Sequence, residues 1–136
     1  MGFSLLELLV AMAVMVLLIS VGMPGLQQSS QRIQMEVWSQ RLLVLLQQRK
    51  AYAMSSNQTV ALDMQELVTD LPNGLSLKHN YRAGAPLMFE GVSGFARAGT
   101  ITLANPGYGV KLIISGLGRI RMCQDSGSQL PRLRLC

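Results

Sequence analysis

Four arginines near the carboxyl end of the chain are the residues best suited to chemistry. Arg119 and Arg121 flank Ile120, and a similar pattern returns as Arg132-Leu133-Arg134. A single acid, Asp125, accompanies them within the last 18 residues. Planar guanidinium groups match the geometry of phosphate oxygens, so a row of them would bind DNA in a salt-dependent, sequence-independent way. The alternative is a solvated basic face without a ligand.

The spacing of the first pair matters because side chains alternate faces along a β-strand. Arg119 and Arg121 are expected to point the same way, and Ile120 to the opposite, buried side. Aromatic side chains on which a base could stack are scarce, because only Tyr108 is near in sequence. The pattern therefore favours loose contact with phosphates over tight binding of a single strand.

Glu7 is the second residue with chemical meaning, because it stands at the head of a long apolar run. No charged side chain occurs from Leu8 to Gln31, and about 20 apolar residues suffice to span a bilayer. An acid inside such a segment costs roughly 2.5–3.5 kcal/mol, so a partner is expected. If the chain is cut between Gly2 and Phe3, the new amine of Phe3 lies one helical turn from Glu7. The carboxylate also suits the positive end of a helix, and it could pair with the amine of a neighbouring chain.

The run Gly2-Phe3-Ser4-Leu5-Leu6-Glu7, followed by Pro24, resembles the processing region of type IV prepilins and pseudopilins. The resemblance implies cleavage after Gly2 by a prepilin peptidase and N-methylation of Phe3. It gives Glu7 a role in subunit assembly and makes Pro24 a helix-bending residue. Leaders in this family usually carry several residues with Lys or Arg, whereas only Met1 precedes the glycine here. Residues 1–2 are therefore expected to be a truncated leader.

Two simpler interpretations of this region are a secretory signal peptide and a plain single-pass anchor. A secretory signal peptide has a basic start, a shorter apolar core and a small-x-small cleavage site, which Ser20-Val21-Gly22 imitates. Glu7 and the missing basic start argue against it, and a plain single-pass anchor would not need Glu7. Flanking Lys and Arg residues do not fix the orientation. The resemblance implies a single pass through the bacterial inner membrane, followed by a periplasmic or extracellular filament.

The elements that position these residues follow from periodicity. One long helix is expected from Leu5 to about Met54, with a kink or local unwinding at Gly22-Met23-Pro24-Gly25. Residues 3–25 would form its transmembrane half and residues 26–54 its amphipathic half. That second half is expected to lie against a sheet formed within residues 55–136. Its apolar positions at helical spacing are Ile33, Val37, Leu42, Leu45, Leu46 and Tyr52.

After Thr59 the pattern changes to the alternation that is typical of strands, broken by Gly, Pro and Asn turns. Gln65–Leu71 is ambiguous between a strand end and a helical turn. A long helix followed by a small antiparallel sheet is an α+β arrangement, and it is also that of the type IV pilin fold. The expected strands are Val60–Met64, Leu75–His79, Pro86–Glu90, Thr100–Ala104, Tyr108–Ser115 and Leu117–Cys123.

The sequence of the last expected strands resembles one subgroup of this family in particular. The stretches 100–103, 109–115 and 116–121 are similar to the end of GspH/FimT-type minor pilins, and competence pseudopilins share a related ending. In FimT-type proteins of transforming bacteria a Gly-Arg-x-Arg element is associated with DNA binding during uptake. Arg119 and Arg121 match that element, whereas Arg132 and Arg134 are added from local charge alone. The alternative is a type II secretion pseudopilin whose arginines contact acidic groups on the next subunit. A short major pilin is disfavoured by the Arg-rich tail.

Cys123 and Cys136 are the only cysteines. If the pilin resemblance holds, the domain lies outside the cytoplasm, where a disulfide persists. With two cysteines only one pairing is possible. The bridge would close a loop of about 14 residues and hold the tail arginines near Arg119 and Arg121. Two free thiols or half a metal site are the alternatives, but no cluster of His or acidic residues accompanies them.

The charge distribution separates the chain into two parts. Residues 1–74 hold four basic and five acidic side chains, whereas residues 75–136 hold eight basic and two acidic ones. No catalytic set, phosphate loop or metal-ligand spacing is recognisable, so neither an enzyme nor a cofactor is expected. The lone histidine, His79, is expected at the surface or on an edge strand. The expected partners are other pilin subunits, a prepilin peptidase, the inner-membrane assembly platform and DNA.

Overall fold

The computed structural model of the chain describes residues 4–136 and divides into two units, 1–30 and 31–136. The expected processing residues Gly2 and Phe3 lie outside the described residues. Helix α1 (Leu5–Ser56) belongs to both units. It begins two residues after Phe3 and ends two residues beyond the expected Met54.

The first part of α1 is exposed along its whole length. Every side chain from Leu5 to Ser30 is open to solvent, and this helix is long and apolar enough to cross a membrane. Ser4 caps it, because the backbone N–H of Glu7 lies 3.0 Å from the Ser4 carbonyl and 3.4 Å from its Oγ. The backbone stays helical across Pro24, so the expected local unwinding is absent. A bend at Pro24 stays a prediction.

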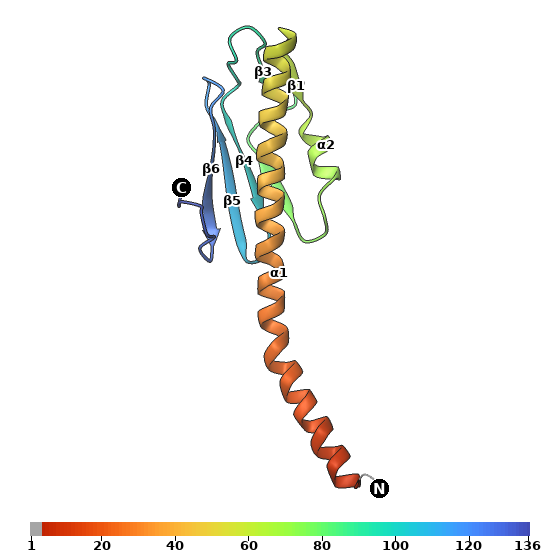
Figure 1. The fold of residues 1–136 in the computed structure, drawn as a ribbon. Coiled ribbons are helices and arrows are strands. Elements are labelled where there is room, and N and C mark those ends of the chain that lie inside the picture. Colours follow the sequence, from red (N-terminus) through yellow and green to blue (C-terminus); the bar gives the residue numbers. More distant parts are fainter. Residues whose placement is uncertain (1–3) are drawn as a thin grey trace. The chain divides into compact units, whose positions relative to one another are not determined.

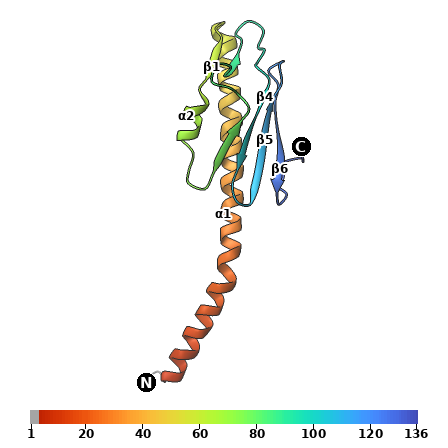
Figure 2. The ribbon, with the colours of Figure 1, turned by 180° about the vertical axis from the view of Figure 1, so that it is seen from behind.

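The second unit packs the rest of α1 against an antiparallel sheet (Figures 1 and 2). Four strands form this sheet in the order β2-β4-β5-β6, and a separate pair, β1-β3, is also antiparallel. The arrangement is the α+β layout that the sequence predicts. Its elements after α1 are β1 (Val60–Leu62), α2 (Met64–Thr69), β2 (Ser76–His79), β3 (Leu87–Phe89), β4 (Gly99–Ala104), β5 (Tyr108–Ile114) and β6 (Ile120–Gly127).

The core lies between α1 and the inner face of the sheet. Met35, Leu42 and Leu46 of the helix are buried. They belong to one core with alternate residues of the strands, and burial of this apolar surface stabilises the unit. The buried strand residues include Leu87, Phe89, Ile101, Leu103, Val110, Leu112 and Ile114.

The face of α1 that meets the sheet differs from the expected one. Leu42 and Leu46 are buried as predicted, but Ile33, Val37 and Tyr52 are exposed. The sequence carries apolar residues on two sides of this helix, so spacing alone did not select the side that packs. Met35 and small residues such as Ser39 and Ala53 complete the buried side instead.

The strand boundaries agree closely with the alternating pattern except at two places. Residues after Asp63 form α2, since the Asp63 carboxylate accepts a hydrogen bond of 2.9 Å from the Gln65 N–H and caps the helix. The last strand begins at Ile120 rather than Leu117 and continues to Gly127 rather than ending at Cys123.

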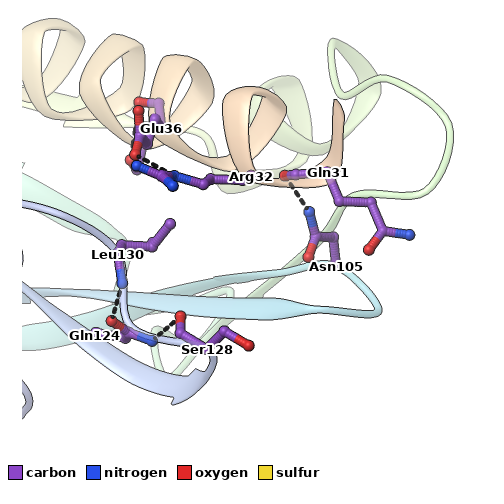
Figure 3. Close-up of polar contacts among 8 residues, drawn as sticks. Gln31, Arg32, Glu36, Asn105, Gln124, Ser128 and Leu130 are labelled. Carbon is purple, nitrogen blue, oxygen red and sulfur yellow. Dashed lines mark hydrogen bonds and ion pairs between the residues drawn. The ribbon is translucent and has the colours of Figure 1, made fainter. Parts of the chain in front are cut away.

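Asn105 attaches the β4–β5 turn to α1. Its Nδ2 donates to the Gln31 carbonyl at 2.8 Å (Figure 3). Its Oδ1 accepts from the N–H groups of Gly107 and Tyr108. One side chain therefore shapes the turn and holds it on the helix. This contact fixes one end of the sheet relative to residues 31–56 of the helix.

Candidate nucleic-acid interface

The arginine pair of the sequence motif lies at the start of β6. Arg119 directly precedes the strand and Arg121 is its second residue, and both side chains are exposed. The turn before them is closed by hydrogen bonds between Ser115 and Arg119. The Ser115 N–H donates to the Arg119 carbonyl at 3.0 Å, and the Arg119 N–H donates to Ser115 Oγ at 3.1 Å. Arg119 is thus held by a turn rather than by the strand that the sequence predicts.

Alternation along β6 separates a core side from an outer side. Ile120 and Met122 pack against the core, and Gln124 is fully buried. Arg121, Cys123 and Asp125 occupy the alternate positions and therefore belong to the outer face of the sheet. The inward position of Ile120 is the one that the sequence predicts.

The carboxyl-terminal tail lies against the free edge of β6. Cys123 and Cys136 form a disulfide, which is the pairing the sequence favours. The Gln124 N–H donates to the Arg134 carbonyl at 2.8 Å, and the Cys136 N–H donates to the Gln124 carbonyl at 3.0 Å. The tail thus adds a short parallel bridge beside β6. In both ribbon views the carboxyl terminus lies beside β6 (Figures 1 and 2).

These contacts bring the tail arginines to the strand that carries the first pair. Arg134 is bonded to the strand three residues beyond Arg121, which is roughly 10 Å along a strand. Arg134 alternates with Leu135 and so shares a face with Cys136, whose disulfide partner Cys123 is on the outer face. Arg132 lies in the preceding turn with a positive φ of 72°. All four arginines are exposed.

Gln124 organises the loop between β6 and the tail, a role that no motif or spacing in the sequence predicts. Its Nε2 donates to the carbonyls of Ser126, Gly127 and Ser128, and its Oε1 accepts from the Leu130 N–H at 2.8 Å (Figure 3). Every polar atom of this buried side chain is satisfied. A glutamine at an inward strand position is the only signal that could have revealed it.

The outer face of the sheet carries two further basic residues, Lys78 and Lys111. Lys78, Thr102, Lys111 and Cys123 form one cross-strand row through the register of β2, β4, β5 and β6. Lys111 forms an ion pair with Asp125, so the only acid on β6 is already neutralised. Among residues 4–136 the other ion pair joins Arg32 to Glu36, and neither includes the four arginines. We call Arg119, Arg121, Arg132 and Arg134 the arginine surface.

Three other acidic residues lie away from β6. Asp63, Glu66 and Asp70 are exposed in and around α2, which contacts β2 at the edge of the sheet opposite β6. Glu90 is closer to the arginine surface, because its carbonyl accepts from the Gly94 N–H and Gly94 lies against Gly118, the residue before Arg119. His79 is exposed at the end of β2, which is the edge strand, as the sequence predicts.

The described part of the chain offers few residues for other kinds of binding site. No cluster of three His, Cys, Asp or Glu residues that could hold a metal is present among residues 4–136. Glu7 lies in the first turn of α1, where its charge suits the positive end of the helix. No protein-family model, curated protein or solved structure matches the chain.

Proposed function

We propose that this chain is a subunit of a type IV pilin-like filament, of the minor pilin or pseudopilin class. It would be anchored in the bacterial inner membrane by the first part of α1 before assembly. Support comes from an exposed apolar helix with one carboxylate, Glu7, in its first turn. A prepilin peptidase would cut after Gly2, and Glu7 would then pair with the amine of Phe3 on a neighbouring subunit within the assembly platform.

The observation that carries this proposal is the second apolar face of α1. Ile33, Val37 and Val44 are 58%, 56% and 47% exposed. At 3.6 residues per turn they lie on the side of the helix opposite Met35 and Leu42, which face the sheet. An α-helix that is apolar on both sides needs a second partner besides its own sheet. Helices of neighbouring subunits would supply that partner.

This proposal is tested by placing a charge on the exposed stripe. Val37→Glu should abolish recovery of the protein in filaments sheared from cells that carry its assembly machinery, because a carboxylate would be buried between helices. Val68→Glu makes the same change at an exposed valine of α2 and should leave recovery unchanged. Membrane levels of both variants are compared by immunoblot. Normal recovery of Val37→Glu would contradict assembly through this face.

A second function, contact with DNA, is favoured by the arginine surface. Four exposed guanidinium groups lie on or beside one sheet edge, and the disulfide holds two of them there. Arginine forks suit phosphate oxygens, and the alternating outer face leaves Arg121 open to a ligand. We propose that the exported domain touches the backbone of incoming DNA during natural transformation. In the alternative, a type II secretion pseudopilin, the same arginines contact acidic groups on the next subunit.

The two functions are distinguished by fluorescence anisotropy with labelled duplex DNA and the full-length protein in non-ionic detergent. Arg119→Gln/Arg121→Gln should weaken binding and lower the slope of log K against log salt by about 2, since each lost phosphate contact removes about 0.9. Arg49→Gln/Arg82→Gln removes the same charge at exposed sites away from β6 and should change the slope little. Failure of the wild-type protein to bind at low salt would favour the purely structural role.

A further inference from the structure

An exposed apolar cluster lies at the end of the sheet where α1 finishes. Val92 and Phe95, between β3 and β4, are 88% and 50% exposed, and Leu117, in the β5–β6 turn, is 74% exposed. Figures 1 and 2 both show the β3–β4 segment and the β5–β6 turn at this same end. The β5–β6 turn leads directly into Arg119. We call Val92, Phe95 and Leu117 the apolar tip.

The two loops that carry the apolar tip are in direct contact. The Ala96 N–H donates to the Gly116 carbonyl at 3.0 Å. Gly118 has a φ of +72°, and a Cβ there would lie 2.1 Å from the Gly94 carbonyl oxygen. Only glycine therefore fits at this crossing. Phe95, placed between Gly94 and Ala96, is thus a neighbour of the turn that presents Arg119.

Two hydrogen bonds of its own backbone groups also hold Phe95 in place. Its N–H donates to Ser93 Oγ at 3.1 Å, and its carbonyl accepts from the Glu90 N–H at 2.8 Å. The opposing turn is fixed to α1, since Lys50 Nζ donates to the Gly118 carbonyl at 3.0 Å. A ring on a fixed backbone loses less conformational freedom on binding than one on a loose loop.

An exposed ring beside a guanidinium is the combination that binds single-stranded nucleic acid. Bases stack on aromatic faces and arginines hold the phosphates, whereas a duplex hides the faces of its bases. Tyr108, the aromatic residue that the sequence places near the arginines, is buried at the start of β5, at the other end of that strand. Phe95, in contrast, is exposed at the end of the sheet where the turn before Arg119 lies.

We infer that Phe95 is a base-stacking platform beside Arg119, and that the ligand of this end of the domain is single-stranded DNA. The inference rests on the proposed DNA contact and adds the strandedness of the ligand. A strand would stack a base on Phe95 and pass its phosphates to Arg119 and then Arg121. Glu90 is the acid nearest to the ring in sequence, and its carboxylate accepts a hydrogen bond from the Ser93 hydroxyl. We expect the strand to run from the ring toward β6, because the arginines lie there.

The test measures binding of full-length protein in non-ionic detergent to labelled oligo-dT and to a duplex of equal length. Phe95→Ala should weaken oligo-dT binding roughly 10- to 100-fold, because stacking of one base is lost, and should change duplex binding little. Its slope against salt should match the wild type. Arg119→Gln should instead lower the oligo-dT slope by about 0.7.

Two further variants make the result specific for stacking. Phe95→Trp keeps an aromatic face and should retain oligo-dT affinity, whereas Val68→Ala removes exposed apolar surface from α2, away from the apolar tip, and should have no effect. Thermal unfolding is compared for all variants. Duplex binding by the wild type, with oligo-dT affinity unchanged in Phe95→Ala, would overturn the inference and leave the DNA contact standing. Equal losses for both DNAs would also overturn it, and no binding of either DNA by the wild type would overturn both.

Discussion

Single residues decide where the tail of this domain lies. Gln124 faces the core of a small domain, where an amide is tolerated only when its donors and acceptors are satisfied. Its four hydrogen bonds all go to backbone groups of residues 126–130. The side chain therefore sets the course of the loop that leads to Arg132 and Arg134.

Gln124→Ala should destabilise the domain by about 2–4 kcal/mol. The substitution leaves the Leu130 N–H and neighbouring carbonyls without partners in a buried place, and it opens a small cavity. Gln129→Ala, at an exposed position of the same loop, should change the free energy of unfolding by less than about 0.5 kcal/mol. Urea unfolding of both variants measures the difference. Equal stability of the two variants would show that the hydrogen bonds of Gln124 are dispensable.

The raised pKa of Tyr81 predicts that the domain loses unfolding free energy at alkaline pH. Burial raises its pKa to about 12, and its hydroxyl donates to the Arg97 carbonyl at 3.2 Å. Because the folded-state pKa exceeds the unfolded value of about 10, the folded state binds more protons between these values. The contribution of this group is complete below pH 10 and is lost as the pH rises toward 12. Tyr81→Phe should flatten the loss of unfolding free energy over this interval, and an unchanged pH profile would contradict this.

The elements were largely predictable from the sequence, and the exceptions have physical reasons. Helical spacing and strand alternation predicted α1 and the positions of the first five strands. The start of β6 was misplaced because apolar Leu117 imitates a strand residue, whereas Gly118 needs a positive φ and forms a turn. The end of β6 was misplaced because an edge strand tolerates polar residues such as Asp125 and Ser126. The contact between the loop that carries Phe95 and the turn before Arg119 was missed because the two segments are far apart in sequence and meet only by loop packing.

The disulfide between Cys123 and Cys136 holds the tail on β6. Closing a loop of about 14 residues stabilises a domain by about 3 kcal/mol in the chain-entropy model. Cys123→Ser/Cys136→Ser should therefore lower the free energy of unfolding by about that amount. Trypsin should also cut after Arg132 and Arg134 faster in this variant than in the wild type, while cleavage after exposed Arg82 should be unchanged. Equal cleavage rates at the tail would show that hydrogen bonds to Gln124 hold it without the bridge.

At the scale of the whole molecule, the proposed functions use separate surfaces. In the proposals, the first part of α1 would anchor the chain in a membrane, and the exposed stripe at Ile33, Val37 and Val44 would serve assembly. The arginine surface and the apolar tip belong to the sheet and its loops, on β6 and at the end where α1 finishes. A subunit built this way can be held in a filament by its helix while its sheet contacts a ligand. The charge distribution agrees, because the basic residues concentrate in the half of the chain that forms the sheet.

If this chain is processed and assembled as a pilin-like subunit, its amino terminus must carry the mark of that processing. The protein would be purified from bacterial membranes with and without a co-expressed prepilin peptidase, and its terminal peptide measured by mass spectrometry. We expect a chain that starts at Phe3 with one methyl group on the amine, only when the peptidase is present, and no cleavage in Gly2→Val. An uncut chain beside an active peptidase, or one that starts at Met23 after signal-peptide cleavage, would contradict it.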